Sequence, residues 1–196
     1  MNIAARILPV VAVLGALGSA QAVTVNFDEF TSPPITCCYG NPSQGVPVVY
    51  PTVTITGGTS GTIMNGSGWN NLQTSGENLY GTLDGSMLLA FNQATSGLSL
   101  DVINGTGAAP FTVSLYDASS MLLATSTVNL PNWGGPSGIA HFSFATGGVY
   151  SATVTGNGDF AIDTIQFAPV PEPETYALML AGLAAVGAMV RRQRRA

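Results

Sequence analysis

The middle of this 196-residue chain lacks basic side chains altogether: between Val23 and Pro169 there is no lysine and no arginine. The same segment carries one histidine, His141, and eight carboxylates. The carboxylates are Asp28, Glu29, Glu77, Asp84, Asp101, Asp117, Asp159 and Asp163. Each must therefore face water, accept hydrogen bonds or bind a cation. Nothing in the segment can neutralise a phosphate, which argues against nucleic acid as a partner.

Cysteine is nearly absent as well, since Cys37 and Cys38 are the only two. Neighbouring Cα atoms lie about 3.8 Å apart, below the usual disulfide range, so an intrachain bond between them would be strained. Disulfides persist in oxidising compartments, which an exported protein meets. Three states stay open for the pair: a vicinal disulfide, bridging to another chain, or two free thiols.

Recognisable catalytic sets are missing too. No G-x-S-x-G motif and no phosphate-binding glycine loop is present, and His141 lies alone inside a predicted strand, residues 139–145. We therefore expect a protein without catalytic activity, and a secreted hydrolase is the least favoured interpretation.

The N-terminal residues have the form of a secretory signal peptide, residues 1–22. Arg6 gives the positive start, Ile7 to Leu17 the apolar stretch, and Ala20-Gln21-Ala22 an A-x-A cleavage site. A membrane anchor is the alternative, but the apolar run is short for a span. We expect the Sec export machinery to take this chain, leaving Val23 as the mature N-terminus.

Alternating apolar and polar residues fill the middle of the chain and predict short strands at roughly ten-residue spacing. The fold class we expect is all-β: a single antiparallel β-sandwich of jelly-roll type over residues 23–168, between an N-terminal signal helix and a C-terminal hydrophobic helix. The expected strands are 23–27, 48–56, 87–91, 97–103, 111–117, 121–130, 139–145, 149–155 and 160–167.

The C-terminal segment, residues 169–196, combines three features. Pro171-Glu172-Pro173 comes first, an apolar run from Ala177 to Val190 follows, and the chain ends on a basic tail with Arg191, Arg192, Arg194 and Arg195. This order resembles the PEP-CTERM sorting region of exported Gram-negative proteins. The two prolines are expected to keep the motif extended for a peptidase.

That resemblance implies an exosortase as partner, cutting near Pro171-Glu172-Pro173. As a helix the apolar run is about 21–23 Å long, short for the bilayer core. Arginines at its end would stay on the cytoplasmic side. We expect a precursor held transiently in the inner membrane by this helix, and a mature form at the cell surface or outside the cell. A plain C-terminal anchor is the alternative.

A second resemblance concerns the predicted first and last strands. Phe27-Asp28-Glu29-Phe30 and residues 160–165 resemble the terminal strands of galactose-binding-like, jelly-roll carbohydrate-binding modules. The resemblance implies a structural Ca²⁺ held by Asp28 or Glu29 together with Asp163, and Ca²⁺ prefers such oxygen ligands. The alternative places Asp163 on the solvent face of an edge strand.

Loop aromatics are the candidates for sugar binding. Trp69, Asn70 and Trp133 fall in turn-rich stretches, where rings can stack on sugars and amides can bond hydroxyls. The alternative is that the rings cap the core.

Together these features predict an exported, exosortase-processed surface or matrix protein with a structural or adhesive role. The resemblance places it in a Gram-negative bacterium that makes exopolysaccharide and forms biofilm, with exopolysaccharide as a further partner. The alternative function is a carbohydrate-binding module with structural Ca²⁺.

Overall fold

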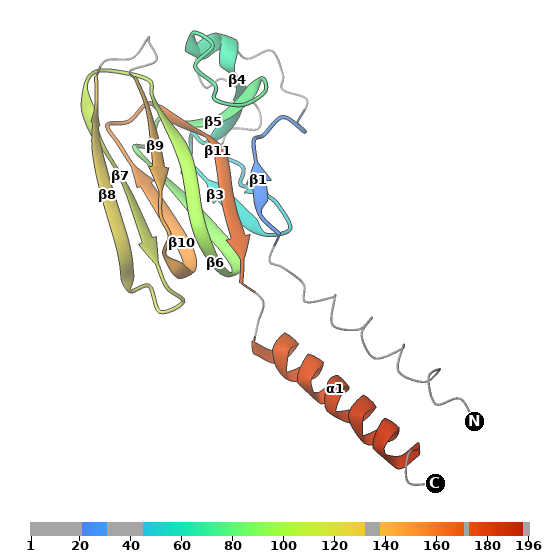
Figure 1. The fold of residues 1–196 in the computed structure, drawn as a ribbon. Coiled ribbons are helices and arrows are strands. Elements are labelled where there is room, and N and C mark those ends of the chain that lie inside the picture. Colours follow the sequence, from blue (N-terminus) through green and yellow to red (C-terminus); the bar gives the residue numbers. More distant parts are fainter. Residues whose placement is uncertain (1–20, 31–44, 132–137, 171–172, 194–196) are drawn as a thin grey trace.

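The computed structural model describes residues 21–30, 45–131, 138–170 and 173–193, so the predicted signal peptide lies outside the described residues except for its last two. Its strands and helices form a β domain followed by a helix (Figure 1). The elements are β1 (Val23–Val25), β2 (Val48–Val49), β3 (Val53–Thr56), β4 (Thr62–Asn65), the 3₁₀ helix η2 (Gly66–Trp69), β5 (Asn78–Thr82), β6 (Ser86–Asn104), β7 (Ala109–Tyr116), β8 (Leu122–Leu130), β9 (Ile139–Ser143), β10 (Gly147–Thr155), β11 (Phe160–Pro169) and α1 (Pro173–Gln193).

The strands pair antiparallel in two layers, which confirms the predicted all-β sandwich. One layer, here called the β11 layer, has the order β4-β5-β11-β6-β9, with β1 added to the later part of β11. The other, the β10 layer, has the order β2-β3-β6-β10-β7-β8.

Strand β6 belongs to both layers and joins them. Its first residues, 86–91, pair with β3 and β10, whereas residues 99–104 pair with β9 and β11. Register shifts and Gly97, whose φ is +64°, lie between these two segments. A strand interrupted in this way can bend and pass from one layer to the other.

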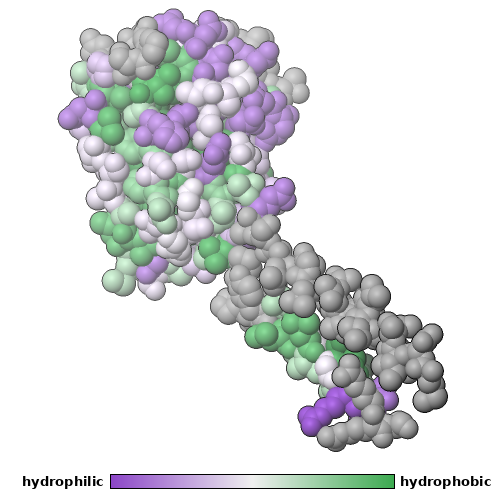
Figure 2. Space-filling model, in the orientation of Figure 1, coloured by the Kyte–Doolittle hydropathy of each residue, from purple (hydrophilic) through white to green (hydrophobic). Residues whose placement is uncertain are grey.

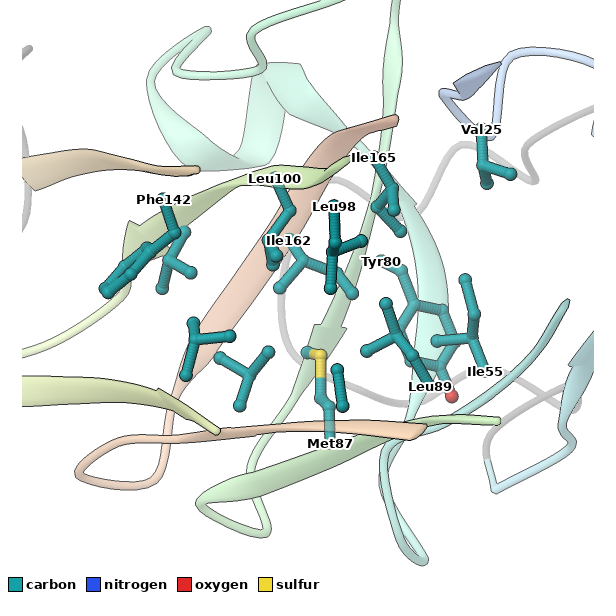
Figure 3. Packing of buried hydrophobic residues seen from close by; sticks show 14 of the residues in the cluster. Val25, Ile55, Tyr80, Met87, Leu89, Leu98, Leu100, Phe142, Ile162 and Ile165 are labelled. Carbon is teal, nitrogen blue, oxygen red and sulfur yellow. The ribbon is translucent and has the colours of Figure 1, made fainter. Parts of the chain in front are cut away.

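The main core lies between the layers and follows from the alternation of apolar residues. Leu98, Leu100 and Ile162 of the β11 layer face Met87 and Leu89 of the β10 layer in one cluster of buried residues (Figure 3). Aromatic pairs add to it: the rings of Phe91 and Phe167, for example, lie edge to face with centroids 4.9 Å apart.

Most predicted strands are present, with two differences. The expected strand 48–56 is split into β2 and β3 around Pro51, and the expected strands 87–91 and 97–103 are parts of the continuous β6. Strands β4 and β5 were not predicted, because residues 57–78 are dominated by glycine, serine and asparagine. Asp117 closes the turn between β7 and β8, because its Oδ1 accepts hydrogen bonds from the amides of Ser119 (2.8 Å) and Met121 (2.9 Å).

Helix α1 begins at Pro173, so the last proline of the predicted motif is the first helical residue rather than part of an extended peptide. Proline suits this position because the amide it lacks has no partner in the first turn. Arg191 and Arg192 occupy the last turn, where positive charge is favourable. In the later part of α1, Leu180, Leu183, Val186 and Met189 are exposed, and a hydrophilic end follows (Figure 2). Among the described residues, no helix combines the length and apolarity required to span a membrane.

Candidate functional site

The outer face of the β11 layer is covered by the segment that connects β4 to β5. Trp69 and Leu72 of this segment pack on Met64, Leu79, Ile103 and Ala161 in a second buried cluster. Neighbouring residues Tyr80 and Ile162 point instead into the main core, so the two clusters lie on opposite faces of the layer.

Trp69 anchors this covering segment. Only 5% of its surface is exposed, and a Cβ atom on Gly105 would lie 2.6 Å from its ring. A ring that stacks on a sugar has to present a face to solvent, so this placement does not fit the stacking role predicted for Trp69 and fits its alternative as a core cap. Asn70 beside it is exposed and has a left-handed backbone (φ 53°).

Further along the same segment, residues 74–78 are held by two aspartates, Asp163 of β11 and Asp28, which follows β1. Oδ2 of Asp163 accepts the amides of Thr74 and Ser75, each at 2.8 Å, and its Oδ1 accepts the Ser75 hydroxyl at 2.7 Å. Oδ1 of Asp28 accepts the amides of Glu77 (2.7 Å) and Asn78 (3.0 Å). We call these two carboxylates and residues 74–78 the loop clamp.

Strained backbone accompanies both aspartates of the loop clamp. Phe27 precedes Asp28 with φ 62°, and Thr164 follows Asp163 with φ 49°. Such conformations cost roughly 1–3 kcal/mol for non-glycine residues and persist where the surroundings enforce them. Phe27 is held by stacking on Tyr80, with ring centroids 5.8 Å apart. Thr164 is held by the hydrogen bond that its backbone amide donates to Asp163 Oδ1 at 2.6 Å.

Burial acts on one carboxyl of the loop clamp, that of Asp163. Asp163 is fully buried, and this desolvation raises the pKa of its carboxyl above the usual range, against the opposite effect of the bonds from Ser75, Thr164 and Thr74. Next to the clamp, burial is also the main cause that raises the pKa of the Tyr50 phenol. The neighbouring Glu29 raises this pKa further.

The predicted calcium ligands are therefore partly brought together, because Asp28 and Asp163 hold the same loop. The groups around the two carboxylates are N–H and O–H donors, however, and they bond to the carboxylate oxygens themselves. Ca²⁺ instead needs six to eight oxygen ligands. Within the described ranges, no three acidic, histidine or cysteine side chains gather as a metal site. Calcium binding stays a prediction.

His141 and Asp101 form a pair beside the clamp that the sequence did not reveal. Asp101 is opposite Asp163 on one side and opposite His141 on the other, and its Oδ1 lies 2.7 Å from His141 Nδ1. The His141 side chain is 61% exposed. In the part of the chain that the structure describes, no serine or threonine hydroxyl bonds to this histidine, so no hydrolytic triad is assembled there.

A second aspartate outside the clamp has the same type of partners. Asp84, in the turn between β5 and β6, accepts the amides of Thr59 and Ser60 and the Ser60 hydroxyl (2.9 Å). Asp84 is exposed, and these bonds, led by that of the Ser60 hydroxyl, lower the pKa of its carboxyl below the usual range.

Several predicted residues cannot be placed. Cys37, Cys38, Trp133, Pro171, Glu172, Arg194 and Arg195 lie outside the described residues.

Comparison with protein families identifies the C-terminal segment: residues 169–195 match the PEP-CTERM protein-sorting motif. The chain thus carries the sorting motif of exosortase-targeted exported proteins, as its Pro-Glu-Pro, apolar run and arginines predict. Among curated proteins, no match is found.

Solved structures with a similar course of the chain are β-sandwich proteins. A DUF4465 family protein from Bacteroides caccae is 14% identical with a TM-score of 0.49, covering 76% of this chain and 100% of that one. The C-terminal family 22 carbohydrate-binding module of Clostridium thermocellum Xyn10B is 15% identical (TM-score 0.39; 62% and 88% covered). TmCBM61, solved with β-1,4-galactotriose, is 11% identical (TM-score 0.35; 76% and 88% covered).

Proposed function

We propose that this chain is an exported, exosortase-processed protein of the cell surface or extracellular matrix, with a structural or adhesive role and no catalytic activity. The observation that carries the proposal is the position of the sorting motif. Its match begins at residue 169, the last residue of β11, so the folded domain leads directly into the segment that an exosortase reads.

In this proposal the Sec machinery exports the chain, and the C-terminal helix holds the precursor in the inner membrane with its arginines on the cytoplasmic side. Cleavage near Pro171-Glu172-Pro173 then frees the domain. Because four of the five basic residues are in this tail and the fifth is Arg6, the mature domain keeps no lysine or arginine. Its ionic partner is a cation, or an exopolysaccharide bridged by cations in the matrix of a Gram-negative biofilm.

Mass spectrometry of the native protein's two ends tests the processing. We expect a mature N-terminus at Val23 and a C-terminus near residues 171–173. Glu172→Ala should leave the precursor uncut, whereas Glu77→Ala, a change at an exposed acidic residue of the domain, should be processed normally. Normal processing of Glu172→Ala would refute the proposal.

The alternative is a carbohydrate-binding module with a structural Ca²⁺, and the observation that favours it is that Asp28 and Asp163 hold one loop. A calcium site there would raise the melting temperature in CaCl₂ relative to EDTA, and Asp163→Asn would abolish the difference. Equal melting temperatures exclude it. Glycan-array binding lost in Asn70→Ala or Trp133→Ala would support sugar recognition, and binding unchanged in both would exclude these residues.

A further inference from the structure

Among the described residues, β8 is a long edge strand, and its own sequence lacks the usual protection. It pairs with β7 on one side and is the outermost strand of its layer (Figure 1). An edge strand presents unpaired amide and carbonyl groups, and proteins usually shield such edges with charges, prolines or very short strands. β8 has 9 residues, Leu-Leu-Ala-Thr-Ser-Thr-Val-Asn-Leu, without a charge or a proline. Its counterpart at the opposite side of the layer, β2, has 2 residues.

The core beneath this edge is incompletely covered. Ala124 and Val128 point inward and pack against the main core but remain partly exposed, whereas Val113 and Leu115 on neighbouring β7 are fully buried. At the start of β8, Leu122 is 56% exposed and Leu123 is 40% exposed. A further strand laid along β8 would cover these apolar side chains.

The order of residues in β8 suits a second copy of the same strand. When two copies run antiparallel about Ser126, Ala124 faces Val128 of the other copy on the inward side, whereas Leu122, which lies beyond a register shift and is opposite Tyr116, is not part of this alternation. On the outward side Thr125 faces Thr127, repeating the hydroxyl pairs that already join Thr125 to Ser114 (3.0 Å) and Thr127 to Thr112 (2.8 Å) across β7 and β8. At the centre of the strand an apolar pair (Ala124 and Val128) and a hydroxyl pair (Thr125 and Thr127) thus face each other, while Leu123 faces Asn129 further out.

The distribution of charge also favours contact between two copies along β8. The domain has eight carboxylates and no basic side chain except His141, so two copies repel each other wherever carboxylates meet. β8 carries none, and the carboxylate nearest to it in the sequence, Asp117, lies in the turn before the strand. This edge lets two acidic domains approach closely.

We propose that two copies of this chain pair through β8, antiparallel and centred on Ser126, so that their β10 layers form one continuous sheet across a two-fold axis. The contact uses the same patch on both copies, and each copy has one such edge in this layer, so the assembly closes as a dimer. This inference does not rest on the sorting role proposed above.

Ser126 gives a specific test because it faces its own copy at the two-fold axis. In the full-length chain in detergent, Ser126→Lys places two ammonium groups opposite each other, and like charges in this position are destabilising. We expect a dimer for the wild type and a mass lower by about half for Ser126→Lys and for Ser126→Glu, measured by sedimentation velocity. Mixing the two variants should restore the dimer, which a misfolded variant could not do.

Thr155→Lys is the matched control, since Thr155 is an exposed threonine on β10, inside the same layer, and its variant should remain dimeric. Amide exchange separates pairing through β8 from association through α1: slow exchange along β8 that becomes fast in Ser126→Lys supports the proposal. A monomeric wild type, fast exchange along β8 in the wild type, or a mixture that stays monomeric overturns it.

Discussion

Two aspartates in this domain each hold a Thr-Ser pair in nearly the same way, yet the pKa values of their carboxyls are shifted in opposite directions. Asp163 accepts the amides of Thr74 and Ser75 and the Ser75 hydroxyl, and Asp84 accepts the amides of Thr59 and Ser60 and the Ser60 hydroxyl. The pKa of the buried Asp163 is raised, and that of the exposed Asp84 is lowered. With similar donors, burial decides the sign.

The two loops also differ in how they are anchored. The segment held by Asp163 is fixed at its other end by Trp69, which is part of the second buried cluster. The Thr59-Ser60 turn is held by hydrogen bonds, among them those to Asp84 and the bond between the Ser60 and Thr82 hydroxyls at 3.0 Å. The clamp therefore belongs to the folded core, whereas the Asp84 contact is a surface turn.

The largest loss of folding stability should come from removing Trp69, which anchors the covering segment. Trp69→Ala empties a buried site, and truncations of this size cost about 3–5 kcal/mol. Urea unfolding measures the loss. Leu83→Ala, which changes a 47%-exposed apolar residue near Asp84, serves as the control and should change little. A small effect of Trp69→Ala would mean that the covering segment is not part of the core.

Removing the clamp carboxylate should come next. Asp163→Ala removes a fully buried carboxyl and leaves the partly buried amides of Thr74 and Ser75 without their acceptor, and the expected loss is about 3 kcal/mol, since each unsatisfied buried group costs roughly 1–3. Asp84→Ala should cost clearly less, because the Asp84 carboxylate is exposed and water can take its place as acceptor for Thr59 and Ser60. Equal losses, measured side by side by urea unfolding, would contradict the distinction by burial.

The pH dependence should separate the two aspartates by sign. A raised pKa in the folded state means that the stability contributed by Asp163 is fully present below its unfolded pKa, near 3.8, and is lost as pH rises through its folded pKa. The contribution of Asp84 is present above 3.8 and is lost as pH falls through its lowered pKa. The destabilisation by Asp163→Asn should therefore shrink as pH rises, and that by Asp84→Asn should shrink as pH falls, in unfolding curves measured from acidic to neutral pH.

The smallest change in stability is expected from breaking the Asp101–His141 contact, in which Asp101 bonds to a side chain instead of loop amides. His141 is largely exposed, and exposed ion pairs contribute about 0–1 kcal/mol, so His141→Ala should change stability by less than about 1 kcal/mol. Thermal melts at neutral pH can check this, with Ser143→Ala on the same face as a control. A larger loss would show that His141 supports the clamp next to it.

The sequence predicted the alternating strands of the two layers better than it predicted β5 and the segment with Trp69 that covers the outer face of the β11 layer. Strands such as β7 alternate cleanly, because each lies between the main core and an opposite polar face. β5 is buried along its whole length, Asn78 to Thr82, since the segment with Trp69 covers its second face, and the alternation disappears. Pattern reading fails for a strand buried on both faces and interrupted by glycine.

The clamp could be predicted only in part. The likeness of the terminal strands implied a Ca²⁺ held by Asp28 or Glu29 together with Asp163. The structure brings Asp28 and Asp163 to one loop, and calcium binding stays a prediction. What they hold depends on the register between β11 and β5 and on the course of residues 66–77, which no local pattern determines. The Thr-Ser pair at residues 74–75 gave no signal by itself, because Thr-Ser also occurs at residues 31–32, 59–60, 95–96 and 125–126.

The position of β11 also has a mechanical consequence. This strand is flanked by β5 and β6, also pairs with β1, and continues directly into the sorting segment. A pull on the C-terminal end therefore acts along an inner strand, and its hydrogen bonds to three neighbours bear the load together, in shear, instead of opening one after another. While the precursor is held by its C-terminal segment, such an arrangement would resist a pull from that end more strongly than attachment through an edge strand would.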